Sequence, residues 1–505
     1  MIYHCEDRTC NYWDEGEKLP ERCPQCGRKL LRANEADMTG DDWTALGNTL
    51  WYAEASDKKR MVDCFRKAAY LGSAWGVCNL GICMEQGNGV EADPVQAFWL
   101  YQQAVEMGSL NAVCCLGVCY QYGIGTAPDA EKAAELYCKA AEYGSPRGQM
   151  LLARAFHDGI GVEADAAEAV HWVRAAAYQR YGEGMHRLGV CYEYGDGVEQ
   201  NWEHAVHWFR EAAESGVSAA MTYLGYCYEK GCGVEQSWEQ AFSWYRRGAE
   251  CGYPVSMSNL GLCYKRGYGV EQNWQEAIKW YEQGAQCGHL QSMNNLACCY
   301  EGGEGVEQNE ERALYWYRRS AEGGNGVAMC NLGWCYQRGY GVEQNEDRAL
   351  YWYRRGAEAG SVYCMFYLGW NYSNGVGVKQ NMTEAIRWYT AAAEGGNADA
   401  MHNLGWHYDH GEGVEQDMKK AICWYERAAE QNHPAAMNSL GECYAMGRGV
   451  PRDLETAMEW YRRAAELGEA MADYNMGWHL EQAGKLSEAY AHYRKAADGN
   501  DDSAW

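Results

Sequence analysis

The sequence is poor in proline, in phenylalanine and in positive charge. Its 505 residues include 8 Pro and 6 Phe, and 44 Lys and Arg stand against 70 Asp and Glu, so the formal net charge is −26. A surface that binds a nucleic-acid duplex needs clustered Lys and Arg to neutralise the phosphates. The acidic balance therefore argues against nucleic acid and favours protein or peptide partners.

Long apolar runs are also missing. No stretch approaches the roughly eighteen apolar residues of a membrane-spanning helix, and the N-terminal residues MIYHCEDRTC contain no apolar segment of a secretory signal. We therefore expect no membrane insertion and a cytoplasmic location. No Ser/His/Asp, Cys/His or phosphate-loop arrangement stands out, so the sequence indicates neither a small-molecule substrate nor an enzymatic activity.

The chain is rich in one repeated pattern. The pair Leu80-Gly81 recurs every 36 residues, and Leu152, Leu296 and Met476 keep the phase where the pair is altered. A fixed period of this length is typical of a solenoid. The other pairs begin at Leu116, Leu188, Leu224, Leu260, Leu332, Leu368, Leu404 and Leu440.

Each unit has the pattern of two helices joined by a sharp turn. In the unit of Leu260, apolar residues from Met257 to Tyr264 form one stripe at helical spacing, and Gly267 is placed to end that helix in a left-handed conformation. Thirteen residues after each leucine position stands Asp, Asn or Ser, the residue types that cap a helix N-terminus. These residues are Asp93, Asp129, Asp165, Asn201, Ser237, Asn273, Asn309, Asn345, Asn381, Asp417 and Asp453.

A column of tryptophans runs along the second helix of the units. No single unit of a solenoid can bury its own apolar face, so we interpret this column as core between neighbouring units and not as a binding site. Its members are Trp172, Trp208, Trp244, Trp280, Trp316, Trp352, Trp388, Trp424 and Trp460.

These residues resemble the Sel-one-like repeat family, a branch of the tetratricopeptide superfamily. Its pattern is a Leu-Gly-x-x-Tyr helix, a Gly-x-Gly-Val turn and an Ala-x-x-Trp-Tyr-x-x-Ala-Ala helix. The resemblance implies an all-α fold, a right-handed α/α solenoid superhelix of about 13 helix-turn-helix repeats. We predict eleven such repeats over residues 73–468, tetratricopeptide-like caps over 41–72 and 469–499, and a tail over 500–505.

Residues 1–32 do not fit the repeat and are predicted to form a separate module, joined by a linker over 33–40. Cys5, Cys10, Cys23 and Cys26 could bring four thiolates to one tetrahedral ion. The Cys-Pro-Gln-Cys-Gly half is similar to a knuckle of rubredoxin-like zinc ribbons, whereas the gap between the first two cysteines is wider than usual. We predict a structural Zn²⁺ site, with unrelated thiols or an iron site as alternatives.

Two histidine pairs and one column of cysteines are also candidates for a metal site or for disulfides, and we interpret both as structural residues. His204 with His207, and His407 with His410, have a helical spacing that suits a metal, but neither pair has a third ligand nearby. Eight cysteines share one column, and equivalent positions on successive first helices should lie at least about 8–10 Å apart, beyond the roughly 7 Å Cα limit for a disulfide. We predict buried free thiols at Cys83, Cys119, Cys191, Cys227, Cys263, Cys299, Cys335 and Cys443.

The first helices line the concave side of a tetratricopeptide-like superhelix, so two of their columns are candidates for a binding groove. An Asn amide can donate to and accept from a peptide backbone, and an exposed Trp is a common interface anchor. The alternatives are surface asparagines kept by repeat copying and tryptophans packed in the core. The candidates are Asn259, Asn295, Asn331 and Asn403, before the leucine position, and Trp334, Trp370 and Trp406, two residues after it.

The resemblance implies a non-enzymatic adaptor or scaffold that binds a protein or an extended peptide in this groove. Acidic residues one turn onward (Glu193, Glu229, Glu301 and Asp409) suggest that the ligand carries some Lys or Arg beside its apolar anchors. The alternative is a hydrolase of the β-lactamase type, an activity attributed to some cysteine-rich relatives. That alternative requires export and disulfides, and the sequence indicates neither.

Overall fold

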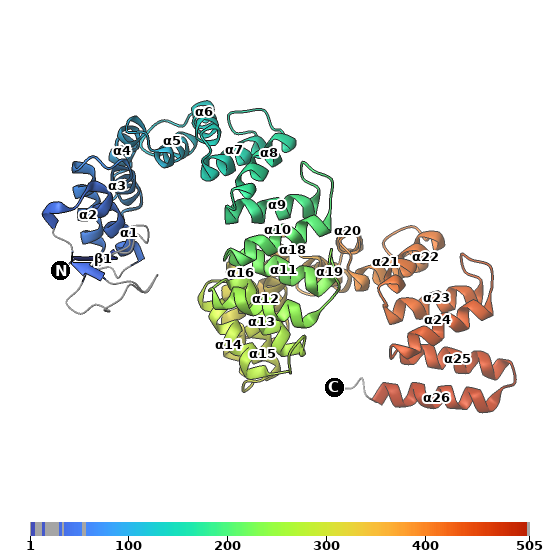
Figure 1. Ribbon diagram of the computed structural model, residues 1–505. Coiled ribbons are helices and arrows are strands. Elements are labelled where there is room, and N and C mark those ends of the chain that lie inside the picture. The colour runs from blue at the N-terminus through green and yellow to red at the C-terminus, as the bar shows by residue number, and fades with distance from the viewer. Residues whose placement is uncertain (1, 6–12, 16–29, 33–34, 53–56, 502–505) are drawn as a thin grey trace. The chain divides into compact units, whose positions relative to one another are not determined.

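The structure is a computed structural model that describes residues 2–5, 13–15, 30–32, 35–52 and 57–501. Within these residues the chain forms 26 α-helices, three short strands and two short 3-10 helices (Figure 1). The helices follow one another as antiparallel pairs, a first and a second helix per repeat, and so form the α/α solenoid that the sequence predicts. The chain divides into two units, Met1–Ser256 and Met257–Trp505, each of which is described by itself.

The helices of the first unit begin after a short 3-10 turn, η2 (Glu35–Asp37), and a second such turn, η3 (Leu50–Tyr52), follows the first helix. They are α1 (Gly40–Thr49), α2 (Lys58–Tyr70), α3 (Ala74–Gln86), α4 (Pro94–Glu106), α5 (Leu110–Tyr122), α6 (Ala130–Glu142), α7 (Pro146–Asp158), α8 (Ala166–Tyr178), α9 (Gly182–Tyr194), α10 (Trp202–Glu214), α11 (Ser218–Lys230) and α12 (Trp238–Glu250).

The boundary between the two units falls within α13 (Pro254–Arg266). The helices that follow are α14 (Trp274–Gln286), α15 (Leu290–Gly302), α16 (Glu310–Glu322), α17 (Gly326–Arg338), α18 (Glu346–Glu358), α19 (Val362–Asn374), α20 (Met382–Glu394), α21 (Ala398–His410), α22 (Met418–Glu430), α23 (Pro434–Met446), α24 (Leu454–Glu466), α25 (Ala470–Gln482) and α26 (Leu486–Asp501).

The N-terminal residues contribute a small antiparallel sheet. Its strands are β1 (Ile2–Cys5), β2 (Trp13–Glu15) and β3 (Leu30–Arg32), in the order β2-β1-β3. The register pairs Cys5, at the end of β1, with Leu30, at the start of β3. Of the four predicted zinc ligands, only the backbone of Cys5 is described; Cys10, Cys23 and Cys26 lie outside the described residues.

The turn between the two helices of a repeat depends on two glycines. Gly159 ends α7 with φ +68°, in the left-handed region that other residues enter at a cost. At Gly161 a Cβ atom would lie 1.9 Å from the backbone oxygen of Ala130 in α6, so the turn rests directly on the preceding repeat. The next helix is capped as predicted, because Asp165 accepts hydrogen bonds from the backbone of Ala167 and Glu168. The same capping holds at Asn381, which accepts from the Glu384 backbone.

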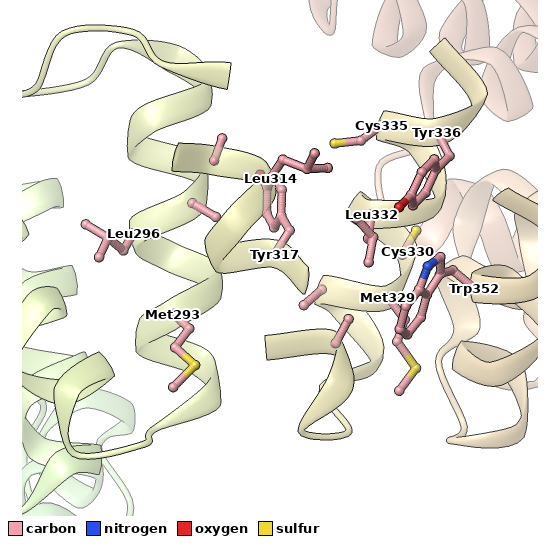
Figure 2. Close-up of a cluster of buried hydrophobic side chains, with 14 of the residues drawn as sticks. Met293, Leu296, Leu314, Tyr317, Met329, Cys330, Leu332, Cys335, Tyr336 and Trp352 are labelled. Atoms are coloured by element: carbon pink, nitrogen blue, oxygen red, sulfur yellow. The ribbon is translucent and has the colours of Figure 1, made fainter. Parts of the chain in front are cut away.

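The interior of most repeats is built around a tyrosine at the position after that of the tryptophan column. Tyr353 is fully buried. Gly333, the glycine of a Leu-Gly pair, lies against its ring, and a Cβ atom added there would be 2.5 Å from the ring. The absence of a side chain at this glycine therefore leaves space for the tyrosine. Figure 2 shows such packing in the second unit, where Leu314 and Tyr317 of α16 lie between α15 and α17. The fully buried tyrosines of this column are Tyr101, Tyr137, Tyr245, Tyr281, Tyr317, Tyr353, Tyr389, Tyr425 and Tyr461.

The tryptophan column packs against this core, as predicted, but closer to the surface than the tyrosines. Trp316 is half-buried against the second unit's core, and Trp352 is buried. Arginines cover these rings: the guanidinium of Arg319 lies 5.6 Å from the Trp316 ring centre, and that of Arg427 lies 4.2 Å from the Trp424 ring centre. At these distances a guanidinium is attracted to the ring face.

All eight cysteines of the predicted column are buried free thiols. Burial raises the pKa of Cys299 to about 11 and that of Cys335 to about 12, so little of the reactive thiolate is present in the folded protein at neutral pH. By contrast, the thiols of Cys251, Cys287 and Cys423 are exposed.

We expect iodoacetamide, without reductant, to label Cys251, Cys287 and Cys423 in the folded protein and to leave the buried column unlabelled. Denaturation should then expose every thiol of the column, and mass spectrometry of the peptides measures the labelling at each site. Recovery of the column as cross-linked peptides after denaturation would contradict the free-thiol assignment.

None of the helices in the described part of the chain combines the length and the apolar character that crossing a lipid bilayer requires.

Candidate partner-binding surface

The two predicted columns share one face of the first helices. Asn331 and Trp334 lie three residues apart on α17, and Asn403 and Trp406 lie three apart on α21, a spacing that places side chains side by side on a helix. Asn259 and Asn295 occupy the same positions on α13 and α15. The structure thus brings asparagine and tryptophan together within a helix.

The tryptophan row is partly exposed to solvent. The exposed fraction is 38% for Trp370, 37% for Trp406 and 40% for Trp478. Trp334 differs, because it is half-buried against the core and lies 5.8 Å from the ring of Tyr340. A row of large rings with this exposure is unusual on a surface that contacts only water.

Further apolar side chains extend this surface. They include Tyr363, about two turns before Trp370 on α19, and Met471 and Tyr474 on α25. The ring of Tyr367, between Tyr363 and Trp370 along the helix, stacks on the buried Tyr353 at 5.1 Å, which ties the exposed side chains to the core. We define the aromatic row as Val327, Trp334, Tyr363, Trp370, Trp406, Met471, Tyr474 and Trp478; all of these except Trp334 are exposed.

The asparagine column is half-buried and partly engaged within the chain. The Asn331 amide donates to the Asn294 side-chain oxygen on α15 at 3.0 Å, and the oxygen of Asn295 accepts from Gln291 at 2.9 Å. Asn403 lies near the hydroxyl of Tyr389, where it partly offsets the rise in the pKa of Tyr389 that burial causes. These amides therefore connect the solenoid internally, and each keeps only part of its hydrogen-bonding capacity for a partner.

The predicted acidic neighbours are half-buried or buried, and each has a partner within the chain. Glu301 accepts the Tyr317 hydroxyl at 2.5 Å, and Glu229 accepts the Tyr245 hydroxyl at 2.8 Å. Asp409 is buried and pairs with the Arg448 guanidinium at 3.0 Å. Each of these carboxylates thus has a partner within the chain, and the expectation that they select a basic ligand stays a prediction.

Glu193 is also buried, and burial raises the pKa of its carboxyl. The buried ring of its repeat belongs to Phe209, which has no hydroxyl to donate. One carboxyl oxygen of Glu193 has no hydrogen-bond partner within the described part of the chain. The sequence carries a signal for this role, because in four units an acidic residue lies sixteen residues before the buried tyrosine.

The two histidine pairs differ in their surroundings. His204 and His207 are exposed, whereas His407 is buried with its Nδ1 3.0 Å from the Glu412 backbone oxygen. His410 stacks on Trp406 with ring centres 4.3 Å apart. Among the residues that the structure describes, no group of three or more His, Cys, Asp or Glu side chains is arranged to hold a metal ion.

The sequence matches the protein-family model of the Sel1 repeat in twelve consecutive segments, the last of which covers the helix pair α25 and α26 that we expected to cap the array. The matched segments are residues 76–109, 112–145, 146–181, 182–217, 218–253, 254–289, 290–325, 326–361, 362–397, 398–433, 434–469 and 470–501. No curated protein matches the chain.

Two solved structures are similar over much of their length. One is c5321, a protective antigen present in uropathogenic Escherichia coli strains and displaying an SLR fold, with 32% identity, a TM-score of 0.55, and coverage of 87% of this chain and 94% of that chain. The other is a Sel1 repeat protein from Oxalobacter formigenes, with 32% identity, a TM-score of 0.45, and coverage of 48% of this chain and 96% of that chain.

Proposed function

The chain belongs to the Sel1 repeat family, whose members generally act as protein-interaction scaffolds, and from this premise we propose that it is a non-enzymatic adaptor that binds an extended polypeptide on the aromatic row. The observation that supports this site is the set of exposed rings on first helices of the second unit, above all Trp370, Trp406 and Trp478. Tryptophan contributes strongly to binding where a partner covers it.

The proposed ligand is an extended segment with apolar or aromatic side chains. Side chains of such a segment would lie on the rings, while its backbone would reach the amide groups beside them. Asn331 retains its side-chain oxygen and one N–H for this purpose, and Asn259, Asn295 and Asn403 take equivalent places on their helices. The net charge of −26 favours ligands that also carry Lys or Arg.

A library of displayed peptides selected on the intact protein tests this proposal. We expect the selected peptides to be rich in aromatic and large aliphatic residues and to lose affinity when Trp370 and Trp406 are replaced. Peptides that bind both the wild type and the tryptophan variant equally would place the binding site elsewhere.

We further propose that the N-terminal module holds one structural Zn²⁺ through Cys5, Cys10, Cys23 and Cys26. The register of the sheet supports this, because Cys5 pairs with Leu30, which follows Cys26 by only four residues in the sequence. Four thiolates fill the coordination sphere of the ion, so the site would support folding and leave no open position for catalysis.

Purified protein is expected to carry about one zinc ion per chain, because four thiolates satisfy tetrahedral zinc. Replacing Cys23 and Cys26 together with Ser should remove it, as measured by elemental mass spectrometry. The matched control replaces the exposed Cys251 and Cys287 with Ser and should keep the metal. An unchanged zinc content in the first variant would refute the site.

A reducing compartment such as the cytoplasm is part of the same proposal. The described cysteines are free thiols, many of them in the core, and thiols of this kind persist where the cell keeps them reduced. The labelling experiment on the buried cysteine column tests this point as well.

A further inference from the structure

One repeat of the first unit lacks the buried ring on which the others are built. At the position held by Tyr101, Tyr137 and Tyr245 in other repeats, this repeat has Val173. Its Leu-Gly pair is altered as well, because Ala153 replaces the glycine that normally lies under the ring. A valine and one extra methyl group fill less space than a tyrosine.

A cavity of about 280 Å³ lies at this place, between α7, α8 and α9. Ala153, Val170 and Val173 form an apolar floor, and all three are buried. His157 lines the cavity at the position where five other repeats have a Glu or Gln that accepts the tyrosine hydroxyl. The absent ring thus leaves both an apolar space and an unusual polar rim.

The rim has more hydrogen-bond donors than available acceptors. The ring nitrogens of His157 lie 2.7 Å from Asp158 and 3.2 Å from Asp196, so both carboxylates already have a partner. The Arg154 guanidinium uses its Nε, at 3.3 Å from Asp158. That of Arg187 approaches Asp196 only to 3.8 Å, beyond hydrogen-bonding distance.

The remaining acidic group of the rim is also engaged. Glu183 accepts a hydrogen bond from the Tyr181 hydroxyl at 3.3 Å. Among the described residues, the rim groups without a hydrogen-bond partner are therefore guanidinium N–H donors of Arg154 and Arg187. Such donors pair best with a carboxylate, which Arg can hold through two parallel hydrogen bonds.

We propose that this cavity is a binding site for a small carboxylate with a compact apolar body. The apolar body lies against Ala153, Val170 and Val173, and the carboxylate lies between Arg154 and Arg187. The volume is just below the roughly 300 Å³ at which ligand pockets usually begin, so it suits a ligand about as large as one amino acid. A free organic acid and the C-terminal residue of a polypeptide both present this chemistry.

This site is separate from the aromatic row, since it lies on other helices and selects for another chemical group. N-acetyl-L-phenylalanine is a suitable probe, and N-acetyl-L-phenylalanine amide is its uncharged counterpart. Met150 also lines the cavity, so methyl-labelled methionine in the full-length protein provides a local NMR signal, assigned with Met150→Leu.

We expect the Met150 methyl resonance to shift saturably with the acid and not with the amide. Arg187→Gln should weaken binding at least about tenfold, because a charged hydrogen bond is lost. The double variant Ala153→Gly/Val173→Tyr restores the glycine and ring of the other repeats, and it should fold as stably as the wild type while the acid no longer binds.

Equal shifts with the acid and the amide, or no shift at millimolar acid, would overturn the proposal. Continued binding of the acid to Ala153→Gly/Val173→Tyr would also overturn it. If that variant fails to fold, an Arg187→Gln affinity for the acid equal to that of the wild type would overturn the proposal. A short peptide that ends in a free C-terminal Phe separates the two sources. Tighter binding of the peptide than of the N-acetyl acid supports a polypeptide C-terminus, and tighter binding of the acid supports a free organic acid.

Discussion

Replacing Tyr353 with Ala is expected to destabilise the surrounding repeats by about 3–5 kcal/mol, the range for removing a large buried ring. The ring is fully buried, stacks on Tyr367 at 5.1 Å, and its hydroxyl donates to Gln337 at 2.9 Å. Amide hydrogen exchange over α17 to α19 should therefore accelerate roughly a hundred- to several-thousand-fold, since each 1.4 kcal/mol is a factor of ten.

Tyr351→Ala is the matched control for that experiment. Tyr351 lies two residues earlier on α18, and 52% of its surface is exposed. Its removal should change stability by no more than about 0.5 kcal/mol. Equal effects of the two substitutions would show that the tyrosine column is not the interior of the solenoid.

Replacing Trp370 and Trp406 together with Ala should weaken binding of a library-selected peptide by about 2–4 kcal/mol, as expected for aromatic hot spots. This corresponds to roughly a 30- to 1,000-fold rise in Kd, measured by fluorescence polarisation with labelled peptide. Because both rings are more than one third exposed, the helical circular dichroism and Tm should change little.

The control for the tryptophan pair removes two exposed rings from second helices. Tyr315 and Tyr351 are about as exposed as the aromatic row, but they lie on α16 and α18. Their joint replacement with Ala should leave the Kd unchanged. A large fall in Tm for the tryptophan variant would instead assign Trp370 and Trp406 to the core.

Much of the fold could be predicted from the sequence because each repeat carries its own local signals. The cap residue Asp165 and the turn glycine Gly159 act through backbone geometry within a few residues, so their roles were predictable without knowledge of the neighbouring repeat. Because the pattern recurs every 36 residues, the same cap and turn can be predicted at the equivalent positions of the other repeats. These signals also explain why Asn381 was correctly interpreted as a cap.

The order of burial within a repeat was harder to predict. Trp316 and Tyr317 are adjacent and both apolar, and periodicity places both near the core. The difference between them depends on packing against the next repeat. Tyr317 is fully buried there, whereas Trp316 is half-buried and covered by Arg319. The role of Glu301 depends on the same fact, because its carboxylate receives the hydroxyl of the enclosed ring.

The binding surface was predictable only in part. Trp370 and Trp406 lie on the face of the first helices that is turned away from the core, so their exposure could be predicted. The hydrogen bond between Asn331 and Asn294 depends on how closely successive first helices approach. The cavity at Val173 could have been found from the sequence, because one missing ring in an otherwise aromatic column is visible there.

The most direct test of the proposed binding surface is where a bound peptide touches the protein. A library-selected peptide that carries a photoreactive diazirine in place of one apolar residue can be cross-linked to the full-length chain and mapped by mass spectrometry. Binding on the aromatic row predicts cross-links on the first helices α17, α19, α21 and α25. Cross-links confined to second helices such as α16 and α18, or to residues 1–256, would contradict it.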